Sequence, residues 1–372
     1  MNRQTIVFVI NFFPISTGGA ELQSYQIANA MKDHFNVHFI TIDPKVKCIT
    51  TENTNGFTVW KIPRYNISRR VLGKNQFLYY WNIKRVFSKI KPDYVYQRCA
   101  GFSTWICGIL KNHFNYRFTF HMAADFDVQP VKIINFRSLI SAIEKNCVRK
   151  GLKQADHIFV QNEVQKNGCE TFYHRTNSQL VYNFSYPLPH PIEKTNSKIQ
   201  VTWVANIKPM KKPEIFIEIA KHFANDQRIK FTMIGTPGQE SIMNLINQTK
   251  QDQSNFEYLG HIPNEEVNTI LEHSHLLINT SDFEGFSNVF VQAWFRGCAV
   301  ASLNANPDKI ITKYSTGYCA NGSYEQLISF IETYLNDTQL QQTLSNNALQ
   351  FANEHLSATN VLPQIIKGIT GK

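Results

Sequence analysis

A short polar segment in the second half of the chain has the residue types needed to bind a phosphorylated polyol. Residues 281–288 read Ser-Asp-Phe-Glu-Gly-Phe-Ser-Asn and follow an apolar, strand-like run. The strand would deliver Glu284 to a loop, where Gly285 permits an unusual turn and a helix beginning near Asn288 offers N–H groups to an anion. A carboxylate beside such donors suits a polyol, because it accepts hydrogen bonds from hydroxyls. The plainer alternative is that Glu284 only caps the helix.

Two other polar positions accompany this segment. Gln292 lies eight residues after Glu284, about two helical turns, so it projects from the same side of the predicted helix. The loop at residues 208–212, Lys-Pro-Met-Lys-Lys, follows an earlier strand-like run. Lys211 in this loop can neutralise a phosphate as a point charge. By itself, such a lysine cluster is more typical of a solvated loop.

The first half of the chain holds weaker candidates. Gly18 and Gly19 follow an apolar run and open a helical pattern, so the backbone can approach a ligand there. Their spacing matches neither a dinucleotide-binding fingerprint nor a P-loop, and a tight strand-to-helix turn explains it equally well. His121 ends another strand-like run, where a lone histidine is more often structural. Asp125 and Asp127 follow it and suit acceptor contacts or a helix cap.

Alternating short strands and amphipathic helices must position these residues. Short apolar runs recur in both halves, each followed by a loop and a helical pattern. Such strands are expected at residues 6–11, 37–42, 200–204, 230–234, 276–279 and 299–303. This order predicts parallel sheets built from βαβ units, so the fold class is α/β with two Rossmann-like, doubly wound domains. Ligands of such sheets bind beyond the carboxyl ends of the strands, and two facing domains would enclose a cleft.

A proline-rich stretch marks the expected linker between the two domains. Three prolines fall between Tyr186 and Pro191, where they cannot continue a helix and stiffen the crossing. We therefore predict an N-terminal domain over residues 1–190 and a C-terminal domain over residues 191–372. The last helix is expected to pack back on the N-terminal domain.

The charge of the chain is unevenly distributed. Its 372 residues carry a formal net charge of +10. Residues 1–190 hold 24 Lys and Arg against 11 Asp and Glu, whereas residues 191–372 hold 14 against 17. The stretch Asn53–Pro92 contains nine basic residues, no acid and several aromatic residues. This combination favours an anionic membrane surface as a partner, with a solvated basic surface as the alternative. No nucleic-acid recognition module is present, so nucleic acid is not expected as a partner.

Composition excludes several other classes of protein. Apolar residues make up 43% and charged residues 18% of the chain, which is typical of a globular protein and not of a disordered one. No run approaches the roughly 18 apolar residues that a membrane helix needs. Seven cysteines without a C-x-x-C pair indicate neither a disulfide framework nor a metal site. We therefore expect no metal and a cytoplasmic location.

Taken together, these motifs resemble the retaining glycosyltransferases of family four, which have the GT-B fold. The resemblance rests on Gly18-Gly19-Ala20-Glu21, the loop at 208–212 and Glu284-Gly-Phe-Ser-Asn, and it runs from residue 6 to about 335. It implies transfer of a sugar from a nucleotide diphosphate sugar, with retention at the anomeric carbon and without a cofactor or metal. The acceptor, a lipid-linked or polysaccharide-precursor glycan, would be held by the N-terminal domain and the donor by the C-terminal domain.

The resemblance also implies roles for individual residues. Glu284 and His121 would act at the reacting centre, and Gly18 and Gly19 would form an acceptor or phosphate loop. The donor would be bound by Lys211, Asn206, Gly285, Phe286, Ser287, Asn288 and Gln292. If the basic stretch Asn53–Pro92 docks on the inner face of the cell membrane, the enzyme would meet a lipid-linked acceptor there.

Two positions depart from the family pattern and keep other functions open. The family usually has Glu where this chain has Gln292, and Arg where it has Asn206. Both replacements remove a charge, so donor binding should be weaker. A catalytically weakened or non-catalytic partner subunit is therefore an alternative, as is a nucleotide-sugar epimerase of similar fold. Retention of Glu284, Lys211 and His121 favours the transferase.

Overall fold

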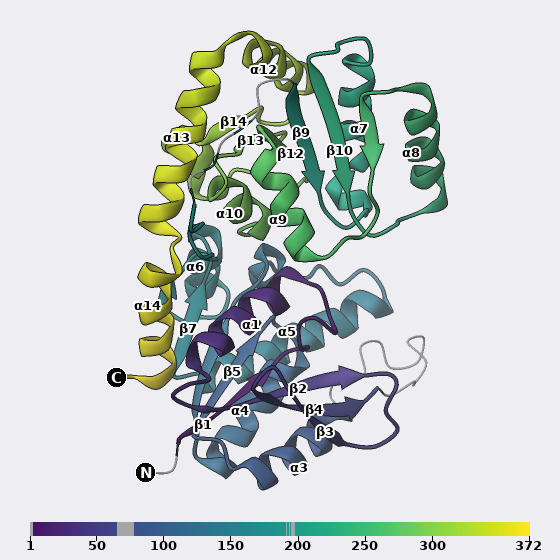
Figure 1. Ribbon diagram of the computed structural model, residues 1–372. Coiled ribbons are helices and arrows are strands. Elements are labelled where there is room, and N and C mark those ends of the chain that lie inside the picture. The colour runs from purple at the N-terminus through teal and green to yellow at the C-terminus, as the bar shows by residue number, and fades with distance from the viewer. Residues whose placement is uncertain (1–2, 65–77, 191, 193, 195–197) are drawn as a thin grey trace. The chain divides into compact units, whose positions relative to one another are not determined.

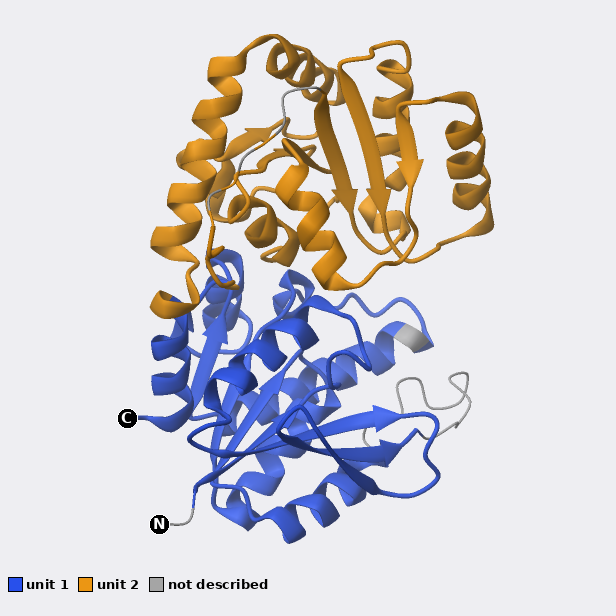
Figure 2. Ribbon diagram, in the orientation of Figure 1, with its two compact units in different colours: residues 1–182, 361–372 blue, residues 183–360 orange. Residues whose placement is uncertain are grey.

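The chain folds into two compact units, which Figure 2 shows in different colours. The computed structural model describes residues 3–64, 78–190, 192, 194 and 198–372. Unit 1 comprises Met1–Tyr182 and Val361–Lys372, and unit 2 comprises Asn183–Asn360. Each unit has its own sheet and its own buried apolar core.

Unit 1 is built on an eight-stranded sheet with the order β3-β4-β2-β1-β5-β6-β7-β8 (Figure 1). All neighbouring strands are parallel except β3, which pairs antiparallel with β4. The strands are β1 Thr5–Val9, β2 Asn36–Asp43, β3 Thr50–Thr54, β4 Phe57–Pro63, β5 Tyr94–Arg98, β6 Arg117–His121, β7 His157–Val160 and β8 Ser178–Leu180. The central strand β1 is buried on both faces, with Ile6, Val7 and Phe8 fully buried, and its sequence is therefore continuously apolar.

Helices connect the parallel strands of unit 1. Those described are α1 Gly19–Met31, α3 Tyr80–Ile90, α4 Phe102–Phe114, α5 Phe136–Gln154 and α6 Glu163–Thr171, with the short η2 at Asp125–Val128. Two glycines allow α4 and α5 to touch, since a Cβ on Gly108 would lie 2.7 Å from the Cα of Gly151. Larger side chains at this crossing would push the two helices apart.

Unit 2 is built on a six-stranded, wholly parallel sheet with the order β11-β10-β9-β12-β13-β14. The strands are β9 Ile199–Val204, β10 Ile229–Ile234, β11 Phe256–Tyr258, β12 Leu276–Asn279, β13 Ala299–Ser302 and β14 Gly317–Cys319. The helices are α7 Pro213–His222, α8 Glu240–Asp252, α9 Asn264–His273, α10 Asn288–Trp294, α11 Ile310–Lys313, α12 Tyr324–Asn336 and α13 Thr338–His355, with η3 at Pro209–Lys211 and η4 at Pro307–Lys309. The expectation of two doubly wound α/β domains is confirmed.

The border between the units differs from the expected linker after residue 190. The structure divides the chain after Tyr182. Asn183 Nδ2 donates a hydrogen bond to Phe286 O at 2.7 Å, and Ser185 N donates to Leu356 O at 3.1 Å. These bonds fasten residues 183 and 185, which precede the proline-rich stretch, to unit 2.

The C-terminal end of the chain is also divided between the units. Helix α13 belongs to unit 2, whereas most of α14, Ala358–Thr370, belongs to unit 1. There Ile365 and Ile369 are buried, and Arg117 of β6 donates from Nε to Ile369 O at 3.1 Å. None of the described helices combines the length and the apolar character needed to cross a membrane.

Candidate functional site

Two loops of unit 2 begin at the same edge of its sheet. Strands β9 and β12 are parallel neighbours, so the loops that follow them start side by side. The first carries η3 and the second carries residues 280–287. Asp282 N donates to Met210 O at 3.1 Å, and Thr280 Oγ1 donates to Lys211 O at 2.6 Å. Trp203 Nε1 donates to Thr280 Oγ1 at 3.0 Å and anchors this contact in the core.

Glu284 lies at the centre of this loop pair. Its Oε1 atom accepts hydrogen bonds from Lys211 Nζ at 2.5 Å, Ser281 Oγ at 2.8 Å and Asn279 Nδ2 at 3.2 Å. The side chain is 13% exposed, so the carboxylate is mostly shielded but reaches the surface. Among the described residues, no hydrogen-bond donor is assigned to Oε2. The arrangement therefore orients a carboxylate through one oxygen and presents the other.

The other polar residues of the lysine loop differ in their surroundings. Lys212 has a left-handed backbone with φ of 45°, which turns the chain from η3 into α7, and its ammonium pairs with Asp282. Lys208 and Asn206 are exposed. The structure thus brings Lys211 to Glu284 and engages Lys212 in a second ion pair.

Gln292 is fastened to the neighbouring helix α9. The residue is 7% exposed, and its Nε2 donates to Asn264 Oδ1 at 2.8 Å and to Asn268 Oδ1 at 2.9 Å. Just beyond the end of α10, Arg296 donates from Nη1 to Gln292 O at 3.1 Å and from Nε to Asn268 O at 2.9 Å. Because both amide hydrogens are engaged, a ligand at Gln292 would meet the amide oxygen.

The turn between Glu284 and α10 is held by packing. Phe286 is 5% exposed, and its ring lies 6.4 Å from that of Trp294. The backbone oxygen of Phe286 accepts the bond from Asn183 described above. Any contact of Phe286 with a donor would therefore involve its backbone. The helix that follows is only seven residues long and ends at Trp294.

In unit 1, His121 is enclosed by the core. It ends β6, is 1% exposed, and its Nδ1 shares a 2.8 Å hydrogen bond with the hydroxyl of Tyr96. Burial, with the nearby charge of Arg98, holds the pKa of His121 well below its ordinary value, so the ring is neutral. These surroundings favour the structural alternative for this histidine.

The Gly18-Gly19 turn carries a carboxylate of its own. Glu21, in the first turn of α1, folds back so closely that a Cβ on Gly18 would lie 2.2 Å from Glu21 Oε2. Ser16 Oγ donates to the other oxygen, Oε1, at 3.1 Å. A negative group therefore already lies at the helix start where a phosphate was expected. This contact favours a tight strand-to-helix turn.

The two aspartates that follow His121 connect loops of unit 1. Asp125 Oδ1 accepts from Asn162 Nδ2 at 2.8 Å and from Gln165 Nε2 at 2.9 Å. Asp127 is buried, and burial raises the pKa of its carboxyl group to about 6, although backbone N–H groups of Ala100, Ala123 and Ala124 donate to it. These contacts engage both carboxylates within unit 1, and the short helix at Asp125–Val128 has no side-chain cap.

Several supporting residues were not identified from the sequence. Asn279 and Ser281 orient Glu284, and a signal for them existed, since polar residues at the end of a buried strand lie at the carboxyl edge. Asn264 and Asn268 hold Gln292. Their four-residue spacing on one helix marks a common face, but nothing local indicates that this face meets α10.

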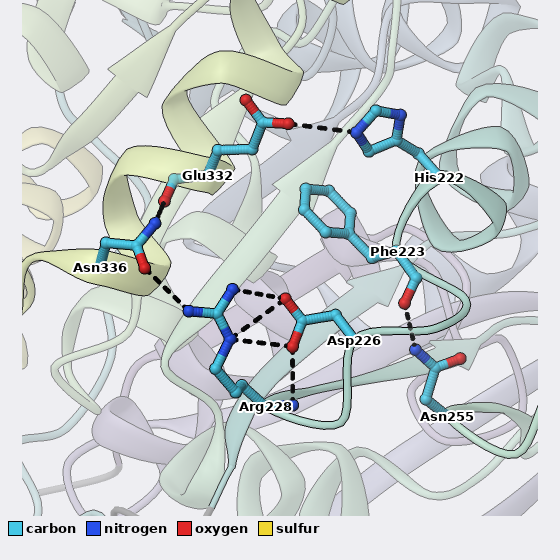
Figure 3. A network of polar contacts seen from close by, with 7 residues as sticks. All are labelled: His222, Phe223, Asp226, Arg228, Asn255, Glu332 and Asn336. Atoms are coloured by element: carbon cyan, nitrogen blue, oxygen red, sulfur yellow. Dashed lines mark hydrogen bonds and ion pairs between the residues drawn. The ribbon is translucent and has the colours of Figure 1, made fainter.

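A separate polar network lies where α7 ends and β10 begins, at the amino end of that strand (Figure 3). Arg228 Nη2 pairs with Asp226 Oδ2 at 2.6 Å, and Nη1 donates to Asn336 Oδ1 at 2.8 Å. His222 Nε2 lies 3.2 Å from Glu332 Oε1. These residues line an open depression of about 520 Å³. The charged groups of this network are paired with one another. The bond from Arg228 to Asn336 connects the loop before β10 to α12.

Within the described residues, no cluster of three or more His, Cys, Asp or Glu side chains is arranged to hold a metal ion. The contacts at the Glu284 loops suit hydrogen bonding to hydroxyls and neutralisation of an anion by lysine.

A comparison with protein families finds a match to most of unit 2. Residues 189–351 match the family model for glycosyl transferases group 1, and the match includes both the lysine loop and the Glu284 loop. No curated protein sequence matches the chain significantly. The family match supports glycosyltransferase activity.

Solved structures similar to the whole chain establish its fold. Sucrose-phosphate synthase from Thermosynechococcus elongatus has a TM-score of 0.78 at 14% identity, covering 98% of both chains. HepE from Anabaena, in complex with UDP, has a TM-score of 0.75 at 16% identity, covering 99% of this chain and 100% of that one. WaaG, a glycosyltransferase involved in lipopolysaccharide biosynthesis, has a TM-score of 0.72 at 14% identity, covering 99% and 100%. The chain has the GT-B fold, as the sequence resemblance implied.

Proposed function

We propose that this protein is a retaining glycosyltransferase that moves a sugar from a nucleotide diphosphate sugar to a lipid-linked or other glycan acceptor. The observation that carries the proposal is the environment of Glu284. Three donors orient one carboxylate oxygen, and the other has no assigned donor among the described residues. A carboxylate fixed in this way can accept hydrogen bonds from the hydroxyls of a donor sugar without reorganising.

Lys211 supplies the electrostatic part of the proposed chemistry. Departure of the nucleotide builds negative charge on its phosphates, and a nearby ammonium lowers the energy of that charge. Lys211 Nζ lies 2.5 Å from Glu284 Oε1. The carboxylate that would bind the sugar therefore also positions the ammonium group that would contact the diphosphate. Exposed Lys208 adds positive charge in the same loop.

Gln292 would contact the ribose of the nucleotide. Its engaged Nε2 leaves the amide oxygen to accept a hydroxyl hydrogen, as a neutral substitute for the family's glutamate. A neutral acceptor forms a weaker hydrogen bond than a carboxylate, so donor affinity should be modest.

The choice of donor to test first follows from the similar structures. HepE from Anabaena has been described with UDP and with UDP-glucose. Uridine diphosphate sugars are therefore the first donors for this chain. Retention of the anomeric configuration is implied by the sequence resemblance, and it is tested by determining the anomeric configuration of the product. No metal ion or covalent intermediate enters the proposed mechanism.

The test measures release of nucleoside diphosphate from a panel of nucleotide sugars, with and without glycan acceptors. The expected result is acceptor-stimulated release with at least one donor, lost in Glu284→Gln and strongly reduced in Lys211→Ala. Lys230→Ala is a matched control, because Lys230 forms a comparable ion pair with Glu257 at 2.9 Å within the sheet of unit 2. No release from any donor, by a folded protein, would leave the non-catalytic subunit as the better interpretation.

A further inference from the structure

Large apolar side chains are exposed along one short stretch of unit 1. Ile133 is 59% exposed, Ile134 83%, Phe136 59%, Leu139 41% and Ile143 51%. We call these five residues the apolar ridge. Single exposed apolar residues are ordinary on a protein surface, but a contiguous group indicates an interaction site.

The ridge is formed by the first two turns of α5 and the residues just before them. Phe136, Leu139 and Ile143 recur at the spacing of one helical face. Later in the helix, Val148 and Leu152 are buried in the unit. The same helix is thus anchored by its second half and carries exposed apolar side chains on its first half.

Several backbone N–H groups at the ridge have partners within the ridge segment. The hydroxyl Oγ of Ser138 accepts from Ile134 N at 2.8 Å and from Asn135 N at 2.9 Å, while Asn135 Oδ1 accepts from Ser138 N at 3.0 Å. Ser138 Oγ also donates to Asn135 O at 2.7 Å. Transfer of an unsatisfied N–H group to a low-dielectric medium is unfavourable. This capping arrangement removes that penalty for the N–H groups of Ile134, Asn135 and Ser138.

The charges around the ridge are basic. No Asp or Glu occurs between residues 128 and 143, and Lys132, Lys150 and Lys153 are exposed. Lys150 lies seven residues after Ile143, so it continues the exposed face of the helix. Aliphatic side chains flanked by exposed lysines are complementary to an anionic lipid surface, where apolar groups enter the interface and ammonium groups remain near headgroups.

We propose that the apolar ridge inserts into the interfacial region of an anionic lipid bilayer and so holds unit 1 on a membrane. A second copy of the chain fits the ridge less well, because a symmetric contact would bring the same lysines together. Membrane binding by the ridge would give the proposed glycosyltransferase access to a lipid-linked acceptor. Only this purpose of the membrane contact rests on the proposed function.

The ridge changes the location of the membrane contact expected from the sequence. In the stretch Asn53–Pro92, Tyr79 is buried, and Lys61 pairs with Glu52 at 2.7 Å. Trp81 is 70% exposed, so part of that stretch can still contribute. Residues 65–77, with Arg69, Arg70 and Lys74, lie outside the described residues. The described part supplies surface charge and one aromatic ring, whereas the ridge supplies contiguous apolar side chains.

The test is cosedimentation of the full chain with vesicles made of equal parts of phosphatidylcholine and phosphatidylglycerol, compared with phosphatidylcholine alone. The wild-type chain should bind the anionic vesicles. The triple variant Ile133→Ser, Ile134→Ser, Phe136→Ser should lower the partition coefficient at least tenfold at all salt concentrations. Replacing Lys132, Lys150 and Lys153 with Gln should reduce binding mainly at low salt, because salt screens charge and not apolar contact.

Matched controls separate the ridge from other surfaces. Ile109→Ser with Val164→Ser removes exposed apolar side chains elsewhere in unit 1 and should leave binding unchanged. The proposal would be overturned if the ridge variant bound vesicles as well as the wild-type chain does. It would also be overturned if light scattering showed a wild-type dimer that the ridge variant no longer forms, while vesicle binding stayed the same. Circular dichroism verifies folding. Because vesicle binding is measured without donor or acceptor, its failure is distinguishable from failure of the transferase proposal.

Discussion

At the scale of single residues, the surroundings of Glu284 divide the carboxylate into an anchored and a presented oxygen. Glu284→Gln keeps the shape but removes the charge that pairs with Lys211 Nζ at 2.5 Å. We expect turnover to fall by about a hundredfold or more, because an oriented charged acceptor is lost from the reacting centre. The measurement is initial rate of nucleoside diphosphate release. Glu257→Gln, which disrupts the Lys230 pair, should be close to wild type, and a normal rate in folded Glu284→Gln would remove Glu284 from the site.

Gln292 offers a prediction in the opposite direction. Gln292→Glu should tighten binding of a nucleoside diphosphate by up to roughly 2 kcal/mol, because a charged acceptor forms a stronger hydrogen bond with the ribose. The change requires Asn264 and Asn268 to turn their amide groups, so that each donates to the new carboxylate. Calorimetry measures the affinity, and Gln292→Met, which removes the acceptor, should weaken binding. Unchanged or weaker binding in Gln292→Glu would show that the residue serves the α9–α10 contact alone.

Asp127 makes the stability of unit 1 depend on pH. Burial raises the pKa of its carboxyl group from 3.8 to about 6, so the folded state holds this proton more tightly than the unfolded state. Its contribution to stability is therefore present at low pH and falls as pH rises from about 4 to about 6, by about 3 kcal/mol. Relative to wild type, Asp127→Asn should gain about that amount between pH 4 and pH 7. Hydrogen exchange in β5 and β6 measures the difference.

Asp226 is the control for this pH dependence. Hydrogen bonds from Arg228 hold the pKa of its carboxyl group below the ordinary value, so its contribution is present at neutral pH and lost on acidification. Asp226→Asn should therefore show the opposite sign. If the difference in stability between Asp127→Asn and wild type were the same at every pH, the carboxylate of Asp127 would not be the cause of the pH dependence.

At the scale of secondary-structure elements, the crossing of α4 and α5 depends on small residues. A Cβ on Gly151 would lie 2.3 Å from the backbone oxygen of Thr104, which cannot move without shifting α4. Gly151→Ala should therefore lower the free energy of unfolding of unit 1 by about 1–3 kcal/mol, despite the better helix propensity of alanine. Urea denaturation checks this value. Asn146→Ala, at an exposed position of the same helix, should be neutral or slightly stabilising, and equal effects would contradict the packing argument.

At the scale of the whole molecule, the chain passes between the units twice, and its last segment belongs to the first unit. Val361, Ile365 and Ile369 are buried, and Arg117 binds the backbone of α14 at Ile369 and Gly368. Deleting residues 361–372 should destabilise unit 1 by about 5 kcal/mol or more, because three buried aliphatic side chains are lost. Unit 2 has its own core and should change little.

Hydrogen exchange read by mass spectrometry tests this division. In the truncated chain, β6 and β7 should exchange faster, whereas β9, β10 and β12 keep their protection. Deleting only Gly371 and Lys372 is the matched control and should leave both units unchanged. Equal loss of protection in the two sheets would show that the units do not unfold separately.

Periodic patterns in the sequence predicted the alternation of strands and helices and the sheet edge at which the polar loops lie. Short apolar runs and helical spacing predicted the two doubly wound domains, because burial leaves a periodic pattern along the chain. The same pattern located Glu284 after β12 and Lys211 after β9, at the carboxyl edge of one sheet. The family match and the similar structures confirm the GT-B fold.

Which side chains meet could not be predicted from these patterns and follows from the folded structure. Lys211 and Glu284 are 73 residues apart in sequence, and Gln292 meets α9 rather than open solvent. The enclosure of His121, and the border after Tyr182 in place of the proline-rich stretch, likewise follow from contacts between distant segments. Local patterns record whether a position is buried. They do not record which neighbour buries it, because that depends on how whole elements pack against one another.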